Sequence, residues 1–256
     1  MRVLVTGGTG KVGSEVVKAL LGRGASVRVL TRNKEVKLPV GAEVAVGNLL
    51  DADSVRAALD GADKLFLLVA NAAEELTQAL LTFAVARRAK VEHLTYLSVY
   101  QAERFPDVPH FIGKHAVETA LQAFDVPFTI LRPGYFFQND TALKAPLTGP
   151  GLYSAPIGTA GLAAVDVRDI ADAAAVSLTT DGHAGKTYSL VGPAPLSGPG
   201  AAAAWAAALG RPVRYAEPPL DAFEEQLRRM VPAWLAMEVR LITSAVSPRP
   251  RPTSPR

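Results

Sequence analysis

Short apolar runs alternate with longer segments of helical periodicity along the first half of the chain. Six runs rich in branched side chains and leucine predict strands, at residues 3–5, 27–30, 43–46, 65–69, 94–97 and 128–131. Between these runs, apolar residues recur every three or four positions over 11–23, 74–88 and 110–124, which is the spacing of one helix face. The alternation predicts an α/β fold with a doubly wound parallel sheet that helices cover on both faces.

The regular alternation weakens after Pro133, and a Pro/Gly-rich stretch over 146–161 interrupts it. Beyond it, the pattern predicts a helix at 166–178, a strand at 187–191, an alanine-rich helix at 201–209 and a short strand at 213–216. We therefore expect a nucleotide-binding core over 1–145 and a small α+β substrate-binding part over 146–246, in one continuous fold. The pattern does not decide whether the chain from Met230 onward is folded, and residues 247–256 are expected to be a disordered tail.

A glycine-rich turn joins the first predicted strand to the first predicted helix and reads Gly7-Gly8-Thr9-Gly10-Lys11-Val12-Gly13. Glycines at this place allow a tight turn and let a pyrophosphate approach the backbone, while the first amides of the helix point toward its negative charge. The alternative is an ordinary turn. The position of this glycine-rich segment, at the opening of an alternating α/β chain, instead favours a bound dinucleotide and a Rossmann-type fold.

Two cations, Arg32 and Lys34, follow the second predicted strand. A protein that prefers NAD(H) normally carries an acid here, which binds the ribose hydroxyls and would repel a 2′-phosphate, whereas a cation can pair with that phosphate. These residues therefore favour NADP(H) over NAD(H). The alternative is that both are solvated loop charges.

Two further segments follow predicted strands and are interpreted as cofactor-binding. Asn48 and Leu49 come after the third strand, where the Asn48 amide could bind adenine; alternatively Asn48 forms a turn and Asp51 or Asp53 caps the next helix. Val69-Ala70-Asn71 ends the fourth strand, at the carboxyl edge where ligands of such sheets lie.

Several longer motifs are more specific than the glycine turn. They are His110-Phe111-Ile112-Gly113-Lys114 followed by Val117-Glu118, Ile130-Leu131-Arg132-Pro133-Gly134-Tyr135-Phe136-Phe137-Gln138-Asn139, Gly185-Lys186-Thr187-Tyr188-Ser189-Leu190 and Leu209-Gly210-Arg211-Pro212-Val213. With the turn, they make roughly residues 1–225 resemble the short-chain dehydrogenase/reductase superfamily, and in particular its atypical NmrA-like branch. The resemblance implies that Lys114 contacts the nicotinamide ribose; the alternative is a solvated helix lysine.

The usual general acid of that superfamily, a tyrosine four residues before a lysine, has no counterpart here, because none of the six tyrosines has a lysine four residues later. His110 occupies the tyrosine's place relative to Lys114 and is a candidate proton donor, or else a capping or packing residue. Ser98 matches the family serine and could orient a carbonyl. These three residues are the candidate catalytic groups.

Three aromatic residues, Tyr135, Phe136 and Phe137, follow the sixth strand and either wall the nicotinamide pocket or pack as core aromatics.

The composition excludes several other kinds of site. The chain has no cysteine, which excludes disulfides and a cysteine nucleophile, and its histidines form no metal-ligand spacing, so we expect no metal. The excess of 27 basic over 24 acidic residues comes from the arginines after residue 247, so composition does not support nucleic-acid binding.

The start of the chain leaves no room for a signal peptide, and no apolar run approaches the roughly 20 residues of a membrane span, so we expect a cytoplasmic protein. The alanine-rich run 201–209 packs internally or in a homodimer.

The leading hypothesis for the function is an NADPH-dependent reductase of a small, flat electrophile such as a quinone, whose reduction needs little help from an acid. The alternative is a non-catalytic NADP(H) redox sensor that acts through protein partners.

Overall fold

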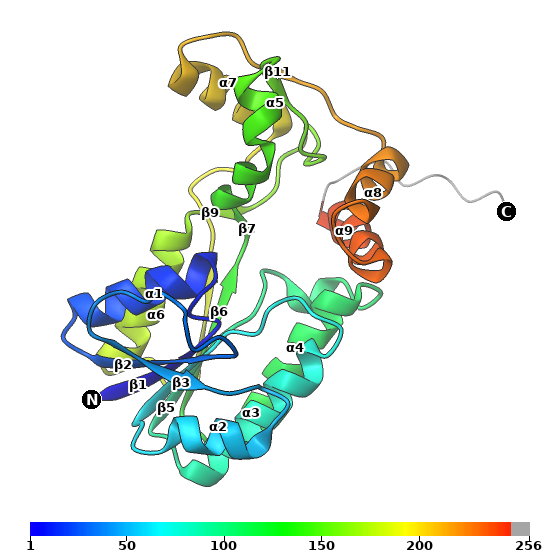
Figure 1. Cartoon of the computed structure of the whole chain (residues 1–256). Coiled ribbons are helices and arrows are strands. Elements are labelled where there is room, and N and C mark those ends of the chain that lie inside the picture. Colours follow the sequence, from blue (N-terminus) through cyan, green and yellow to red (C-terminus); the bar gives the residue numbers. More distant parts are fainter. Residues whose placement is uncertain (247–256) are drawn as a thin grey trace, which may run out of the picture. The chain divides into compact units, whose positions relative to one another are not determined.

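The computed structural model describes residues 1–246, which form two compact units (Figure 1). The first unit comprises Met1–Pro106, Phe111–Gly134 and Val165–Leu190. The second comprises Asp107–His110, Tyr135–Ala164 and the chain from Val191 onward.

The first unit is built on a seven-stranded sheet whose order is β10-β6-β5-β4-β1-β2-β3. All neighbouring strands in this sheet are parallel. Parallel strands buried on both faces are near-continuously apolar, which explains why the sequence pattern located the inner strands; it also located the edge strand β3, none of whose residues is buried. The predicted α/β class is confirmed. The strands are β1 (Arg2–Thr6), β2 (Ser26–Thr31), β3 (Ala42–Val46), β4 (Lys64–Leu67), β5 (His93–Leu97), β6 (Phe128–Pro133) and β10 (Lys186–Leu190).

Helices cover both faces of this sheet. Figure 1 shows α1 (Lys11–Gly22) beside α6 (Val167–Thr179) on one face, while α2 (Ala52–Leu59), α3 (Glu75–Ala89) and α4 (Pro109–Ala123) cover the other. Their apolar faces are buried, as the helical periodicity predicted. A short 3-10 turn, η1 (Ala102–Arg104), lies between β5 and α4. The strand order reverses between β1 and β4, and their carboxyl ends mark the switch point where ligands of such sheets bind.

The second unit has its own small core around the buried Tyr153. Strand β8 (Leu152–Tyr153) pairs with β11 (Arg214–Tyr215), and α7 (Gly198–Leu209) packs against this pair. Ser197 caps α7, and Gly210 ends it in the left-handed conformation. The remaining elements of this region are β7 (Tyr135–Phe136), η2 (Phe137–Leu143), α5 (Lys144–Thr148) and β9 (Ala164–Val165).

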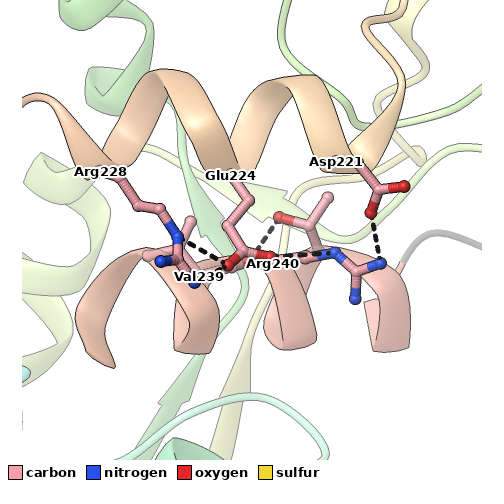
Figure 2. A network of polar contacts seen from close by, with 6 residues as sticks. Asp221, Glu224, Arg228, Val239 and Arg240 are labelled. Carbon is pink, nitrogen blue, oxygen red and sulfur yellow. Dashed lines mark hydrogen bonds and ion pairs between the residues drawn. The ribbon is translucent and has the colours of Figure 1, made fainter. Parts of the chain in front are cut away.

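Residues from Met230 onward, for which the sequence predicted no structure, contribute a helix. Here α8 (Leu220–Arg228) and α9 (Ala233–Val246) pack together as a helical hairpin. Figure 2 shows Arg240 of α9 between two acids of α8, with Nη2 2.8 Å from Asp221 and Nε 3.3 Å from Glu224. Arg228 binds Glu224 as well, at 2.7 Å. The tail expected over 247–256 lies outside the described residues.

The boundary between the two units differs from the one expected at residue 145. Residues 135–145 belong to the second unit, and the chain returns to the first unit between Val165 and Leu190. This return supplies α6 and also β10, which forms the edge of the sheet beside β6. None of the helices described over residues 1–246 is long and apolar enough to cross a membrane.

Candidate functional site

Three of the four glycines in the turn are required by the packing of the chain itself. Gly7 has a φ of +66°, and a Cβ there would lie 2.4 Å from the Leu68 side chain. A Cβ on Gly13 would lie 2.1 Å from the carbonyl oxygen of Gly7, and one on Gly8 would lie 2.7 Å from Val29. No side chain fits at these three positions without displacing its neighbours.

Gly10 differs from these three. Its φ is −86°, which any residue adopts, and the nearest atom to a Cβ would be the Gly7 carbonyl oxygen at 3.4 Å. Gly10 is exposed and is the N-cap residue of α1, and no side chain caps that helix end. A Cβ at Gly10 would therefore make only an ordinary contact with the protein. The turn therefore has the form of an anion cradle, which a pyrophosphate fits.

A single hydroxyl connects the glycine turn to the segment after β4. Thr6 Oγ1 donates to the carbonyl oxygen of Leu68 at 2.7 Å and accepts from the Leu68 amide at 2.8 Å. The predicted cofactor-binding segment Val69-Ala70-Asn71 therefore begins at the switch point, directly beside the turn. Val69 is buried and Ala70 is exposed.

Arg32 and Lys34, after β2, are both exposed and form no ion pair with any residue in 1–246. Between them, the Asn33 side chain accepts from the Glu35 amide at 2.9 Å and fixes the turn. Both cations are thus available to an anion, and their pairing with a 2′-phosphate stays a prediction.

Asn48 forms the turn that was the alternative to adenine binding. Its Oδ1 accepts from the Leu50 amide at 3.1 Å, and Asp51 caps α2 by accepting from the Asp53 amide at 3.0 Å. Leu49 is partly buried against the main core. The turn and the cap are confirmed, while contact of Asn48 and Leu49 with a cofactor stays a prediction.

Lys114 is buried, with 4% of its surface exposed, so the alternative of a solvated helix lysine is wrong. Its Nζ lies 2.7 Å from Glu75 Oε1 at the start of α3 and donates to the Leu97 carbonyl oxygen at 3.1 Å. It also lies 5.2 Å from the centre of the Tyr96 ring, within the range of a cation–π contact. Helices α3 and α4 therefore place an ion pair at the carboxyl end of β5.

Ser98 follows Leu97 directly and is also 4% exposed. Its Oγ has no hydrogen-bond partner among the described residues. A buried hydroxyl without a partner is costly, and such a group marks a place where a ligand or water binds. The Lys114 contact with Leu97 and the buried Ser98 hydroxyl thus occur at the same strand end, while their roles toward a cofactor or substrate stay predictions.

Tyr96 lies beneath this ion pair and is fully buried. Burial, together with the carboxylates of Glu75 and Glu118, raises the pKa of the Tyr96 hydroxyl well above its ordinary value. This hydroxyl therefore stays neutral, and its apolar ring supports Lys114.

His110 lies in the first turn of α4, one turn before Lys114, and is half-buried. The structure groups His110 with the second unit and Lys114 with the first. Neither its role as a proton donor nor the alternative of capping or packing is decided by this placement.

The aromatic segment after β6 packs within the second unit. The buried Asp140 carboxylate accepts from Tyr135 Oη at 3.2 Å, Tyr153 Oη at 3.1 Å and Trp205 Nε1 at 2.9 Å. Burial and the Asp140 charge raise the pKa of both tyrosine hydroxyls. Tyr135 therefore serves as a core aromatic, the alternative to a pocket wall, while Phe136 is half-buried and Phe137 exposed.

Two carboxylates of this region were missed by reasoning from the sequence. Glu75, in the first turn of α3, was given no role in the site. Glu118 binds Arg132 through two hydrogen bonds, at 2.9 and 2.5 Å, and Arg132 also reaches Glu103 at 3.1 Å. Glu118 and Arg132 both lie in the motifs that carry the family resemblance. Those motifs thus include an ion pair that joins α4 to β6.

Comparisons with known proteins give consistent results. The (4-alkanoyl-5-oxo-2,5-dihydrofuran-3-yl)methyl phosphate reductase of Streptomyces griseus is 35% identical over 235 residues, 90% of this chain and 82% of that protein. The NAD(P)H azoreductase of Xenophilus azovorans is 33% identical over 234 residues, 89% and 81% of the two chains. The triphenylmethane reductase of Citrobacter sp., solved with NADP(H), is 25% identical, with a TM-score of 0.81 over 96% of this chain and 90% of that chain.

A family model provides the assignment. The model of the NmrA-like family matches residues 1–246, which is the whole of the described chain. The match includes the glycine turn, the Lys114 helix and the second unit alike. This chain belongs to the NmrA-like family.

Proposed function

We propose that this protein is an NADP(H)-dependent reductase of small, flat, conjugated electrophiles such as quinones. The observation that carries the proposal is the glycine turn, in which Gly10 is free of packing constraints in front of an α1 N-terminus that no side chain caps. The nearby Arg32 supports the phosphorylated cofactor, because it is exposed and forms no ion pair within the described chain.

Each predicted site residue has a place in this proposal. The amides after Gly10 hold the pyrophosphate, and Arg32 and Lys34 bind the 2′-phosphate. Asn48 and Leu49 lie beside the adenine, and Val69–Asn71 continue along the cofactor. Tyr135, which binds Asp140, is left out of this cofactor site. When bound, the cofactor supplies the hydride.

The residues at the end of β5 position the acceptor and the nicotinamide half. Ser98 Oγ is buried without a partner in the described chain and offers a hydrogen bond to a substrate oxygen. Lys114, whose Nζ is held by Glu75 and Leu97, binds the nicotinamide ribose. His110 is the candidate proton donor one helical turn away. A quinone accepts hydride readily, so the absence of a tyrosine acid weakens this proposal less than it would weaken a ketone reductase.

The names of the relatives agree with this class of reaction. They describe reductases of azo compounds, of a furanone phosphate and of triphenylmethane dyes. These substrates differ in charge and size, but each is a conjugated electrophile. We therefore assign the reaction class to this chain and regard the quinone as its simplest test substrate.

The test is steady-state oxidation of NADPH with a panel of quinones, an azo dye and a triphenylmethane dye, alongside calorimetric titration of NADPH and NADH. We expect turnover with at least one acceptor and tighter binding of NADPH than of NADH. Tight cofactor binding without reduction of any acceptor would overturn the reductase and favour the non-catalytic redox sensor. Failure of both cofactors to bind would overturn both readings.

A further inference from the structure

The ammonium of Lys114 and the carboxylate of Glu75 form a buried pair whose charges cancel. Nζ and Oε1 are 2.7 Å apart, and the two side chains are 5% and 12% exposed. Lys114 belongs to α4 and Glu75 to the first turn of α3, so two helices on one face of the sheet bring the charges together. A buried ammonium without a counter-charge would be an unbalanced charge away from water, at a cost in stability. Glu75 therefore supplies the counter-charge of Lys114.

The surroundings of Nζ also fix its direction. Nζ donates to the Leu97 carbonyl oxygen at 3.1 Å, and the Tyr96 ring lies 5.2 Å away. An ammonium has three N–H donors; one is bound to the Leu97 carbonyl oxygen, and the Glu75 carboxylate is in ion-pair contact with the same nitrogen. One donor remains for a ligand, next to Ser98, whose Oγ has no partner in the described chain. The Leu97–Ser98 strand end thus offers two hydrogen-bond donors but no net charge.

We propose that Glu75 is a positioning residue that holds the Lys114 ammonium in place and cancels its charge, so that the acceptor bound beside Ser98 is an uncharged molecule. The inference rests on the proposed function and adds the charge of the substrate to it. Without Glu75, the positive charge of Lys114 would favour an anionic acceptor. With Glu75, an anion entering this site loses its hydration and meets no net positive charge in return.

The experiment compares two acceptors with the same ring system, 1,4-naphthoquinone and its 2-sulfonate, by calorimetry on the full chain saturated with 1,4,5,6-tetrahydro-NADP, a redox-inert analogue whose nicotinamide ring is uncharged like that of NADPH. We expect the wild type to bind the neutral quinone more tightly. Glu75→Gln leaves one net positive charge and should shift the affinity ratio toward the sulfonate by at least about tenfold. Lys114→Gln should shift the ratio the other way, and the double variant should return it to within about threefold of the wild type.

The adjacent Glu74→Gln is the matched control, because Glu74 is exposed and caps α3 with no side-chain hydrogen bond. It should leave the ratio unchanged. Thermal melting establishes that each variant is folded. If Glu75→Gln does not fold, the double variant and Glu75→Asp still decide, since both should keep the preference of the wild type for the neutral quinone. If the ratio of the affinities for the two quinones does not change with the summed charge of residues 75 and 114, the inference is overturned.

A second measurement does not depend on any acceptor. Glu75→Gln leaves the Lys114 charge unbalanced beside an anionic cofactor, so its NADPH affinity should fall more steeply with added NaCl than that of the wild type. If neither quinone binds but this difference appears, the proposed substrate fails and the positioning role of Glu75 stands. If quinones bind and are reduced but the two salt profiles coincide, the reductase stands and the role of Glu75 is overturned.

Discussion

Two strand ends of the same sheet carry cations under opposite conditions. After β2, Arg32 is exposed and forms no ion pair within residues 1–246. After β5, the Lys114 side chain is buried and lies 2.7 Å from a carboxylate. Both ends face the carboxyl edge, where ligands of parallel sheets bind. The sheet therefore offers a free positive charge at one end and a cancelled one at the other.

The difference follows from what each cation costs. An exposed guanidinium keeps its hydration, so it costs little stability when no phosphate is bound, whereas a buried ammonium needs a counter-charge within the protein. The first arrangement suits recognition of a charged group, and the second suits the orientation of a neutral one. Each of the following experiments alters one side of this contrast.

The largest effect is expected from a methyl group in the glycine turn. Gly13→Ala places a Cβ against the Gly7 carbonyl oxygen and should lower the free energy of unfolding by about 3 to 5 kcal/mol. Gly10→Ala meets no such contact and should melt like the wild type, yet lose at least about tenfold in NADPH affinity. Denaturant unfolding and calorimetry separate the two effects. Equal unfolding of both variants would remove the distinction between packing glycines and the ligand-facing glycine.

Next in size is the removal of the buried cation. Lys114→Met leaves the Glu75 carboxylate buried and unbalanced, which should cost about 3 kcal/mol of stability. Lys18→Met is the matched control, because Lys18 forms an exposed pair with Glu15, also at 2.7 Å, and its loss should change stability very little. Urea unfolding of both variants measures the difference. Similar losses would mean that burial does not distinguish the two pairs.

Substitution of Arg32, at the exposed strand end, should change the affinity for the cofactor rather than the stability of the protein. Arg32→Glu should weaken NADPH binding by roughly 10- to 100-fold and NADH binding much less, because only NADPH carries the 2′-phosphate. Arg23→Glu, an exposed change at the end of α1, controls for net charge. An equal loss of affinity for both cofactors would remove Arg32 from the 2′-phosphate site.

The smallest expected effect concerns His93, the first residue of β5, at the amino end of the strand. Burial, Lys64 and His183 lower the pKa of His93 from 6.5 to about 4. Because the folded state binds this proton less readily than the unfolded state, the contribution of His93 is complete above about pH 6.5 and is lost toward pH 4. The loss should be about 1 to 3 kcal/mol. His93→Gln should flatten the slope of stability against pH in this window; an unchanged slope would assign it to other groups.

Local patterns were sufficient to predict most of the sheet and the glycine turn. Strands β1 to β6 are apolar runs of ordinary length, and Gly7 to Gly13 are contiguous, so both are visible in a short window of sequence. The predicted helix at 166–178 and strand at 187–191 exist as well, but their return to the sheet beside β6 depends on contacts between distant segments. A boundary drawn along the sequence could not include them.

Local sequence patterns could not predict the Glu75–Lys114 ion pair. Glu75 and Lys114 are far apart in the sequence, and an acid in the first turn of a helix is explained equally well by the helix dipole. Only the packing of α3 and α4 on one face turns that acid into a counter-ion. The donors around Asp140 were missed for the same reason, because Tyr135, Tyr153 and Trp205 are separated in the sequence and converge on one carboxylate.

The Thr6 hydroxyl has a consequence for the entropy of binding. It joins the ends of β1 and β4 through one donated and one accepted hydrogen bond, so the spacing between the glycine turn and Val69 is set before any ligand arrives. A molecule that spans these two segments meets an edge that is already ordered, and its affinity is not reduced by the ordering of loops. One oxygen atom thus preorganises the switch point of the sheet.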